Sequence, residues 1–219
     1  MYSLHSKPAW PFLLAFVVFC LTQQSCAPIF SEFQTARTVG KDKLEIVPFY
    51  SHLGEIDNGN TYSLQSHGGL QFAYGFCSNF DLRARFDVIG ADGWGEGRSA
   101  FSIGGKYSII EDRLSVFLPV GRALGENTSD SWQIQPTAFL TVPVLENRLD
   151  ATIGPKYVFT FGQNTRNYAG ANLGLSFSTD INKWAIRPEY GILFNPDQSG
   201  LITQFGIGFS ATIGTKSGN

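Results

Sequence analysis

The fold of this chain is decided by the stretch Leu149–Phe161, LDATIGPKYVFTF. Its apolar and polar residues alternate with a period of two, and Val158 is the one apolar residue on the polar face. The first face carries Ala151, Ile153, Pro155, Tyr157, Phe159 and Phe161, and the second carries Asp150, Thr152, Gly154, Lys156 and Thr160. Such alternation predicts a β-strand whose two faces meet different environments. A strand of more than about ten residues is also long enough to cross a membrane at a tilt.

The same alternation recurs from Lys43 onward, and no segment there keeps a helical period. It predicts about ten strands, at 43–53, 62–76, 79–90, 99–109, 113–124, 132–144, 148–161, 167–179, 183–194 and 200–213. Tight turns alternate with longer loops rich in Gly, Asn and Asp, which is the layout of outer-membrane barrels with both termini in the periplasm. We therefore predict an all-β fold, a closed up-and-down antiparallel transmembrane β-barrel over residues 43–214, with a periplasmic tail at 215–219.

A soluble barrel or sandwich would show the same alternation with its apolar face inside. Three features favour the membrane arrangement instead. The polar face carries charges in the middle of several strands, and the apolar face carries aromatic residues toward the strand ends, as interfacial girdles do. A closed barrel also pairs every backbone hydrogen-bonding group, which lipid requires. These features predict a bacterial outer-membrane protein.

The first 25 residues predict a signal peptide. The apolar run from Phe12 to Leu21 is too short to span a bilayer as a helix, and it matches the core of a secretory signal. Cys26 follows the small residue Ser25 and is the expected site of lipidation, although Gln23 stands where lipoprotein signals have an aliphatic residue. Without lipidation, Cys26 and Cys77 could form a disulfide in the oxidising periplasm. Residues 26–42 are predicted to form a periplasmic N-terminal segment.

The opening residues also carry a resemblance. The segments Cys26–Glu32 (CAPIFSE), Gln34–Gly40 (QTARTVG) and Leu44–Pro48 (LEIVP) resemble small outer-membrane β-barrel lipoproteins of the Bacteroidota type. The resemblance covers the first 50 residues best. It implies fold and location rather than activity, because such families are mostly of unassigned function. One departure is the tail after the last strand, which leaves Phe209 in the role of the terminal aromatic residue.

Composition excludes several classes of function and partner. A net charge of −2 gives no basic surface for nucleic acid. We find no cysteine, histidine or acidic motif with metal-ligand spacing, and we expect no metal and no cofactor. The expected partners are outer-membrane lipid, the barrel-insertion machinery and, with lipidation, the lipoprotein-sorting machinery. The sequence does not predict an oligomeric state.

The predicted lumen is lined by charged side chains of both signs. They are Glu45, His67, Arg83, Arg85, Asp87, Lys106, Lys156, Arg187 and Glu189. Ion pairs among them would make a stiff plug, whereas a narrow polar conduit or a ligand pocket would need open space. Small inward residues would leave such space, at Gly104, Gly170, Gly174, Gly206 and Gly208.

These features predict a structural barrel or a passive small-solute transporter with a narrow polar lumen. A ligand- or lipid-binding barrel is the alternative. A less favoured hypothesis is an envelope hydrolase, in which Glu45 and His67 would be diagonal neighbours about 7 Å apart. No nucleophile motif accompanies that pair, so we expect no enzymatic activity and no catalytic residues.

Overall fold

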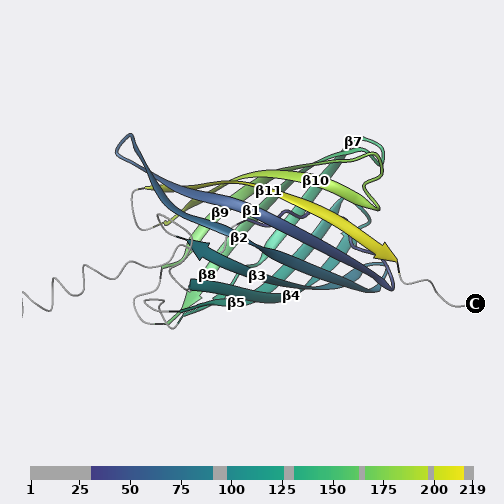
Figure 1. Ribbon diagram of the computed structural model, residues 1–219, viewed down its shortest axis with the longest axis horizontal. Coiled ribbons are helices and arrows are strands. Elements are labelled where there is room, and N and C mark those ends of the chain that lie inside the picture. Colours follow the sequence, from purple (N-terminus) through teal and green to yellow (C-terminus); the bar gives the residue numbers. More distant parts are fainter. Residues whose placement is uncertain (1–30, 91–97, 126–130, 163–165, 197–199, 215–219) are drawn as a thin grey trace, which may run out of the picture.

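The computed structural model describes residues 31–90, 98–125, 131–162, 166–196 and 200–214, which form one β-barrel (Figure 1). Eleven strands make up its wall. They are β1 (Lys43–Asp57), β2 (Asn60–Cys77), β3 (Phe80–Gly90), β4 (Arg98–Ile110), β5 (Leu114–Leu124), β6 (Trp132–Ile134), β7 (Thr137–Leu145), β8 (Leu149–Phe161), β9 (Tyr168–Phe177), β10 (Trp184–Phe194) and β11 (Leu201–Gly214).

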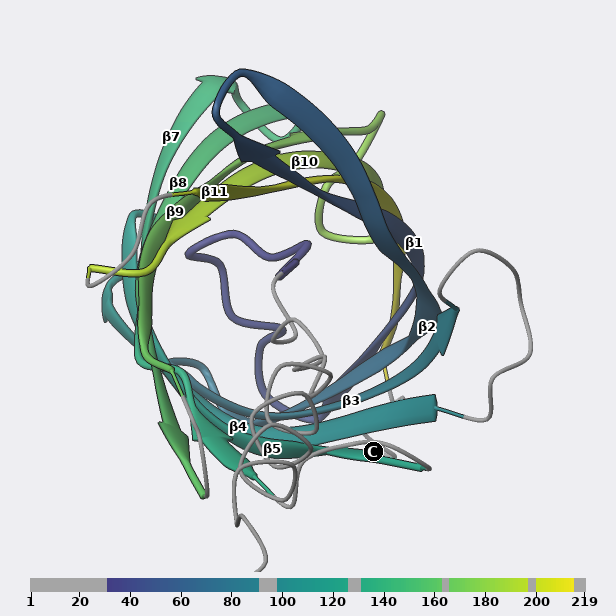
Figure 2. The same ribbon diagram turned by 90° about the vertical axis from the view of Figure 1, so that its left-hand side faces the viewer.

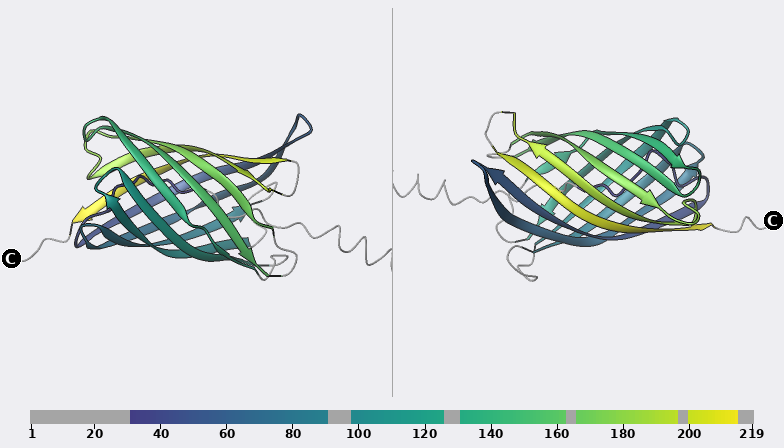
Figure 3. Two further views of the ribbon diagram at one scale, coloured as in Figure 1. Left: turned by 180° about the vertical axis from the view of Figure 1, so that it is seen from behind. Right: turned by 90° about the horizontal axis from the view of Figure 1, so that it is seen from above.

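The sheet closes on itself through its first and last strands. β1 pairs antiparallel with β11, and Lys43 lies opposite Gly214 while Ile56 lies opposite Leu201. Every other strand pairs antiparallel with its neighbours, so the wall has no free edge (Figure 2). Figure 3 shows the strands tilted across the barrel on both of its sides. The prediction of a closed antiparallel barrel is confirmed.

β6 and β7 lie end to end and together occupy one strand position in the barrel wall. We call each strand position a stave, so the wall has ten staves. Val120 on β5 lies opposite Ile134, and Phe117 lies opposite Thr137, which is the same register on both sides of the interruption. No residue is inserted there. The break follows from Pro136, which has no N–H to give to a neighbouring strand.

The outer face of the barrel is apolar, and its inner face is polar. Phe205 is 62% exposed and Leu173 is 59% exposed, while charged residues on the opposite faces of the strands are buried. A soluble barrel would have its apolar residues inside. The arrangement is the one that lipid around a barrel and a polar lumen require. Among the residues that the structure describes, no helix is long and apolar enough to cross a membrane.

The two ends of the barrel differ. Turns of two or three residues join β2 to β3, β4 to β5 and β7 to β8, and residues 178–183 join β9 to β10. All four connections lie at the end where β1 begins and β11 stops, which we call the turn end (Figure 1). The opposite, loop end carries the remaining connections. The β1–β2 hairpin there is longer than predicted, because Asn58 and Gly59 both adopt positive φ and form a two-residue turn.

The largest departure from the sequence-based expectation is at the N-terminus. Residues 26–42 were assigned to the periplasmic side of the barrel, but residues 31–36 are buried inside its lumen (Figure 2). We call residues 31–40 the lumen segment. The predicted signal peptide at 1–25, the lipidation site Cys26 and the tail at 215–219 lie outside the described residues.

Candidate functional site

The lumen segment runs from the middle of the barrel to its turn end. The hydroxyl of Ser31 lies 3.4 Å from that of Ser51, which is in the middle part of β1. The Thr38 hydroxyl donates to the carbonyl of Ser78 in the β2–β3 turn, at 2.6 Å. The Asp42 N–H then donates to the carbonyl of Gly75, and the chain enters β1. The lumen segment therefore occupies the half of the lumen nearer the turn end, and β1 begins where the segment ends.

The carboxylate of Glu189 on β10 binds backbone N–H groups of the lumen segment near Ser31. Its two oxygens accept the N–H groups of Glu32 and Phe33, at 2.8 and 2.7 Å. The amide of Asn172 on β9 also donates to this carboxylate, at 3.0 Å. A carboxylate that accepts several N–H groups forms charge-assisted hydrogen bonds, which are stronger than neutral ones.

Cationic and amide side chains bind the carbonyl groups of the segment. Arg187 donates to the carbonyl of Phe33 at 3.0 Å, and Gln71 donates to that of Glu32 at 2.9 Å. The ammonium of Lys106 donates to two carbonyls at 2.6 Å each, those of Thr35 and Arg37. Arg85 donates to the carbonyl of Ser31 and, at 2.8 Å, to its hydroxyl.

Two further N–H groups complete the set. The Ala36 N–H donates to the hydroxyl of Thr141 at 2.7 Å, and the Val39 N–H donates to the carboxylate of Asp81 at 3.0 Å. In all, nine main-chain groups of the segment bond to side chains of the wall. A buried peptide group without such a partner costs about 1–3 kcal/mol, so the polar lumen is complementary to this stretch of backbone.

The charged side chains of the segment are also paired with the wall. Glu32 forms an ion pair with Lys156 on β8 and accepts the amide of Gln34 at 3.3 Å. Near the turn end, Arg37 bridges Asp150 at 2.6 Å and Asp112 at 2.5 Å. Asp150 is fully buried, whereas Asp112 lies in the β4–β5 turn. The segment is therefore anchored by charge at both of its ends.

Phe33 occupies the space that the small residues of β11 provide. It is 1% exposed, and its ring centroid lies 5.3 Å from that of Phe49. A Cβ atom on Gly206 would lie 2.7 Å from the Phe33 ring, and one on Gly208 would lie 3.1 Å from the Phe33 Cβ. The backbone of Phe33 has a φ of 50°, which is uncommon for a bulky residue and is maintained by the surrounding contacts. Gly206 and Gly208 thus make room for a side chain rather than for solute, whereas Gly104, Gly170 and Gly174 do not contact Phe33.

All nine side chains that the sequence assigned to the lumen are buried. Five of them contact the lumen segment directly, namely Arg85, Lys106, Lys156, Arg187 and Glu189. Glu45 lies between two arginines and accepts from Arg83 at 3.1 Å and from Arg187 at 2.7 Å. These ion pairs hold the arginines in the positions from which they bind the segment and its neighbours.

The remaining charges form a second group nearer the loop end. Nδ1 of His67 lies 3.2 Å from the carboxylate of Asp87, and Nε2 of His67 lies 2.7 Å from the amide nitrogen of Gln65. Asp87 also accepts from Arg85 at 2.6 Å. His67 is therefore linked to Ser31 through Asp87 and Arg85.

The expected proximity of Glu45 and His67 is wrong. Glu45 lies opposite Ala73 on β2, whereas His67 lies opposite Ser51. These positions are six residues apart along β2, which corresponds to about 20 Å in an extended strand. Each side chain has its own partners, so the pair cannot act as the acid and base of a hydrolase.

Sequence reasoning missed several residues that bind the segment. Asp81, Thr141 and Asn172 lie on the polar faces of their strands, so the alternation contained a signal for them. Nothing in the residues 31–40 themselves has a period or a motif that predicts burial. Cys77 is the last residue of β2, and its thiol donates to the side-chain oxygen of Asn79 at 3.0 Å. A disulfide to Cys26 stays untested, because Cys26 is not among the described residues.

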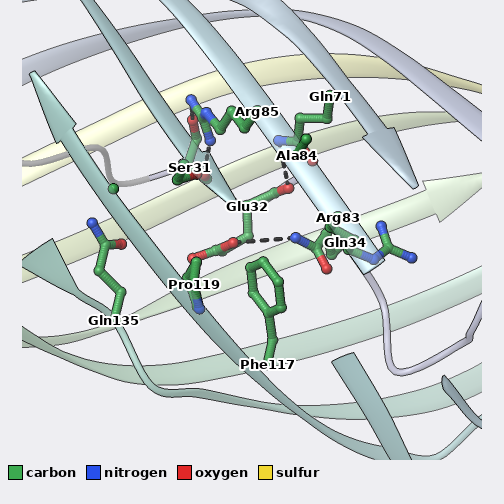
Figure 4. Close-up of a pocket in the computed structure, with 12 residues that line it drawn as sticks. Ser31, Glu32, Gln34, Gln71, Arg83, Ala84, Arg85, Phe117, Pro119 and Gln135 are labelled. Atoms are coloured by element: carbon green, nitrogen blue, oxygen red, sulfur yellow. Dashed lines mark hydrogen bonds between the residues drawn. The ribbon is translucent and has the colours of Figure 1, made fainter. Parts of the chain in front are cut away.

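A small polar pocket remains beside the segment. The pocket is bounded by the part of the lumen segment near Ser31 and by the inner faces of β3, β4 and β5. Gln71 and Gln135 lie at its sides (Figure 4). Ser102 and Gly121 are the small residues that leave this space. On the other side of the lumen, nearer the loop end, Leu53, Val158 and Leu193 pack into a buried apolar cluster. The segment and this cluster thus occupy different parts of the lumen among the described residues.

Comparisons with known proteins give a fold-level likeness only. No protein-family model matches the chain, and no curated protein matches it. Ail, the attachment invasion locus protein of Yersinia pestis, is 13% identical, with 79% of this chain and 99% of that chain covered and a TM-score of 0.37. The translocator domain of the autotransporter NalP from Neisseria meningitidis is 10% identical, with 93% and 96% covered and a TM-score of 0.43.

An outer membrane channel from Pseudomonas putida F1 is also 10% identical, with 88% of this chain and 98% of that chain covered and a TM-score of 0.46. Of these three, only the Pseudomonas putida protein is described by its name as an outer membrane channel. Likeness of this degree carries no argument about activity.

Proposed function

We propose that this protein is an outer-membrane barrel that passes small solutes passively through a narrow polar lumen, and that the lumen segment is its plug. The observation that carries the proposal is the set of nine hydrogen bonds between wall side chains and the segment backbone. Water can replace each of these bonds when the segment leaves. A plug held in this way can be removed without breaking the wall, whose own ladders close independently.

The charged side chains of the wall favour a solute-conducting barrel over a purely structural one. A ten-stave barrel is wider than the eight-stranded kind, which side chains alone can fill. In the emptied lumen, Arg83 and Arg187 would keep their ion pairs with Glu45 along the wall, and Lys106 and Glu189 would face water. Such a lining solvates ions and polar solutes of either sign. Lipid would cover the apolar outer face, with the turn end toward the periplasm.

The ligand-binding alternative rests on the pocket between the segment and β3–β5. That pocket is small, and its polar groups are largely engaged with the segment. A bound small molecule would copurify with the folded barrel and be detected by mass spectrometry of the extracted protein.

The deciding experiment is ion conductance in planar lipid bilayers. The full mature chain with Cys26→Ser should be nearly silent. Glu32→Lys places a second cation opposite Lys156 and should release the plug without altering the wall, and deletion of residues 27–40 should open the lumen fully. Both variants should give steady conductance that increases with salt.

Glu111→Lys in the exposed β4–β5 turn is the matched charge control and should stay silent. Folding of every variant is checked by circular dichroism and by its shift on unheated gels. If the plug variants fold and remain ion-tight, the protein is a structural barrel and not a channel.

We also propose that the signal peptide is removed and that Cys26 carries lipid. The support is the short apolar run before it and the small residue at Ser25. Cells fed an alkyne fatty acid should label the wild-type chain and Cys77→Ser, but not Cys26→Ser. Absence of label together with a mobility change on reduction would instead indicate the Cys26–Cys77 disulfide.

A further inference from the structure

We propose that the lumen is a binding site for peptides in which an acidic residue is followed directly by an aromatic residue. The lumen segment is its resident occupant, and a free peptide of this class competes with it. The inference rests on the proposed release of the plug. It goes further because it assigns the emptied lumen a ligand class of its own.

The contacts divide into a general part and a selective part. The general part consists of bonds to main-chain groups, such as those from Glu189 to two N–H groups and from Arg187 and Gln71 to carbonyls. These bonds do not depend on which side chains the peptide carries. In peptide recognition, main-chain hydrogen bonds supply affinity, and pockets for individual side chains supply specificity.

Two adjacent positions supply the selective part. The carboxylate of Glu32 pairs with the buried ammonium of Lys156 on β8. The ring of Phe33 points the other way, into the trough formed by Gly206 and Gly208 beside Phe49. An ammonium buried in the wall requires an anion, and a glycine trough lined by an aromatic ring requires a flat apolar side chain. An acidic-aromatic pair satisfies both.

The site extends beyond Ser31 toward the loop end. Gln204 lies two positions from Gly206 on β11, is 1% exposed, and neither atom of its amide has a hydrogen-bond partner among the described residues. Gln204 lies opposite Leu53 on β1. Leu53 is two residues closer to the loop end than Ser51, which contacts Ser31. A buried amide with unmet donor and acceptor capacity is costly. A peptide longer than the segment would find there a donor and an acceptor for its next peptide group.

The test uses a dye-labelled synthetic peptide of residues 31–40, SEFQTARTVG, and the chain lacking residues 27–40 in detergent. Fluorescence anisotropy should show saturable binding, and the full chain, whose site is occupied, should bind at least tenfold more weakly. Peptides with Glu32→Lys or Phe33→Ala should each lose at least tenfold in affinity. A scrambled peptide of the same composition is the control.

A charge exchange makes the test specific. The Lys156→Glu barrel should bind the Glu32→Lys peptide better than the native peptide, reversing the preference of the parent barrel. If the truncated chain does not fold, the full chain with Phe33→Ala serves as the receptor, because its own segment is weakened while its wall is unchanged. Equal binding of native and scrambled peptides, or no reversal in the exchange, would overturn the inference.

The two proposals can fail separately. If the emptied barrel conducts ions and the native peptide does not block the current, the peptide site is refuted and the channel stands. If the peptide binds with the stated selectivity but the emptied barrel carries no current, the channel is refuted and the peptide site stands.

Discussion

Glu189 shows how a single residue determines the state of the lumen. Its carboxylate accepts two consecutive backbone N–H groups and one side-chain amide while it is almost fully buried. Hydrogen bonds to a charged group contribute about 1.5–3 kcal/mol, roughly twice the contribution of neutral ones. The positions of the plug residues Glu32 and Phe33 thus depend on one charge on β10.

We expect Glu189→Gln to loosen the plug. The neutral amide has a single acceptor oxygen, and its NH2 group would face a backbone N–H. Loss of about 1.5–3 kcal/mol corresponds to a rise of roughly 10- to 150-fold in the released fraction. Trypsin cleavage after Arg37, which is protected in the lumen, should accelerate accordingly. Glu146→Gln in the exposed β7–β8 turn should leave the cleavage rate unchanged. Equal rates in the two variants would contradict the prediction.

Gly208→Val tests the trough under Phe33. The added side chain would overlap Phe33 and Val47, and overpacking of this kind costs about 1–3 kcal/mol. The midpoint of thermal or urea unfolding should fall, and Phe33→Ala in the same chain should restore part of it because it removes the overlapping ring. Gly214→Val is the matched control, since nothing lies within 4 Å of a Cβ at that position. A loss in Gly208→Val that Phe33→Ala does not relieve would place the clash elsewhere.

At the scale of elements, the stave made of β6 and β7 is the irregular part of the wall. It stays in register through the break, because Gln135 N–H donates to the carbonyl of Pro119 and Tyr157 N–H donates to that of Pro136, both at 3.1 Å. In an antiparallel ladder a residue directs its N–H and its carbonyl to the same neighbour. The missing donor at Pro136 therefore leaves the carbonyl of Tyr157 without its partner in the ladder.

Pro136→Val should join β6 and β7 into one strand. The new N–H would donate to Tyr157, and one added hydrogen bond contributes about 0.5–1.5 kcal/mol. We expect a higher unfolding midpoint and slower amide exchange at residues 135–137. Leu140→Val on the same outward face controls for the change of side chain. Faster exchange in the Pro136→Val chain would show that the proline is needed for a local bend.

At the scale of the whole molecule, the lumen segment has a definite direction along the barrel axis. The chain passes from Ser31 in mid-lumen to Asp42 at the turn end. Cys26 lies five residues before Ser31, a reach of at most about 17 Å. The loop-end half of β1 from Ser51 to Asp57 has a similar length of about 20 Å before its tilt is considered. From the direction of the described residues alone, we predict that the chain before Ser31 leaves the lumen at the loop end, whereas the sequence predicts both termini in the periplasm.

Labelling of single cysteines in intact cells distinguishes the two topologies. In a chain with Cys26→Ser and Cys77→Ser, Ala27→Cys should react with a membrane-impermeant maleimide before lysis. Asn60→Cys at the loop end should behave in the same way, and Asn182→Cys at the turn end should react only after lysis. If Ala27→Cys reacts only after lysis, the N-terminus is periplasmic and the chain must double back within the lumen.

The alternation along the chain was enough to predict the barrel. Alternation is a local property, because a residue and its neighbour two positions on share one face of a strand, and residues such as Arg85 and Lys156 are assigned inward from their own strand alone. Strand pairing is also local, since each strand bonds to the next one along the chain. The tilt and closure then follow from the need to leave no edge in lipid.

The burial of the lumen segment inside the barrel is visible only in the tertiary structure. The lumen segment has no periodicity, and its partners lie far away in sequence, as Glu189 does from Glu32 at a separation of 157 positions along the chain. The separation of Glu45 from His67 depended on the length of the β1–β2 hairpin, which turn chemistry at Asn58 and Gly59 fixes. Contacts across a lumen exist only after the barrel has closed, so no local pattern in the sequence records them.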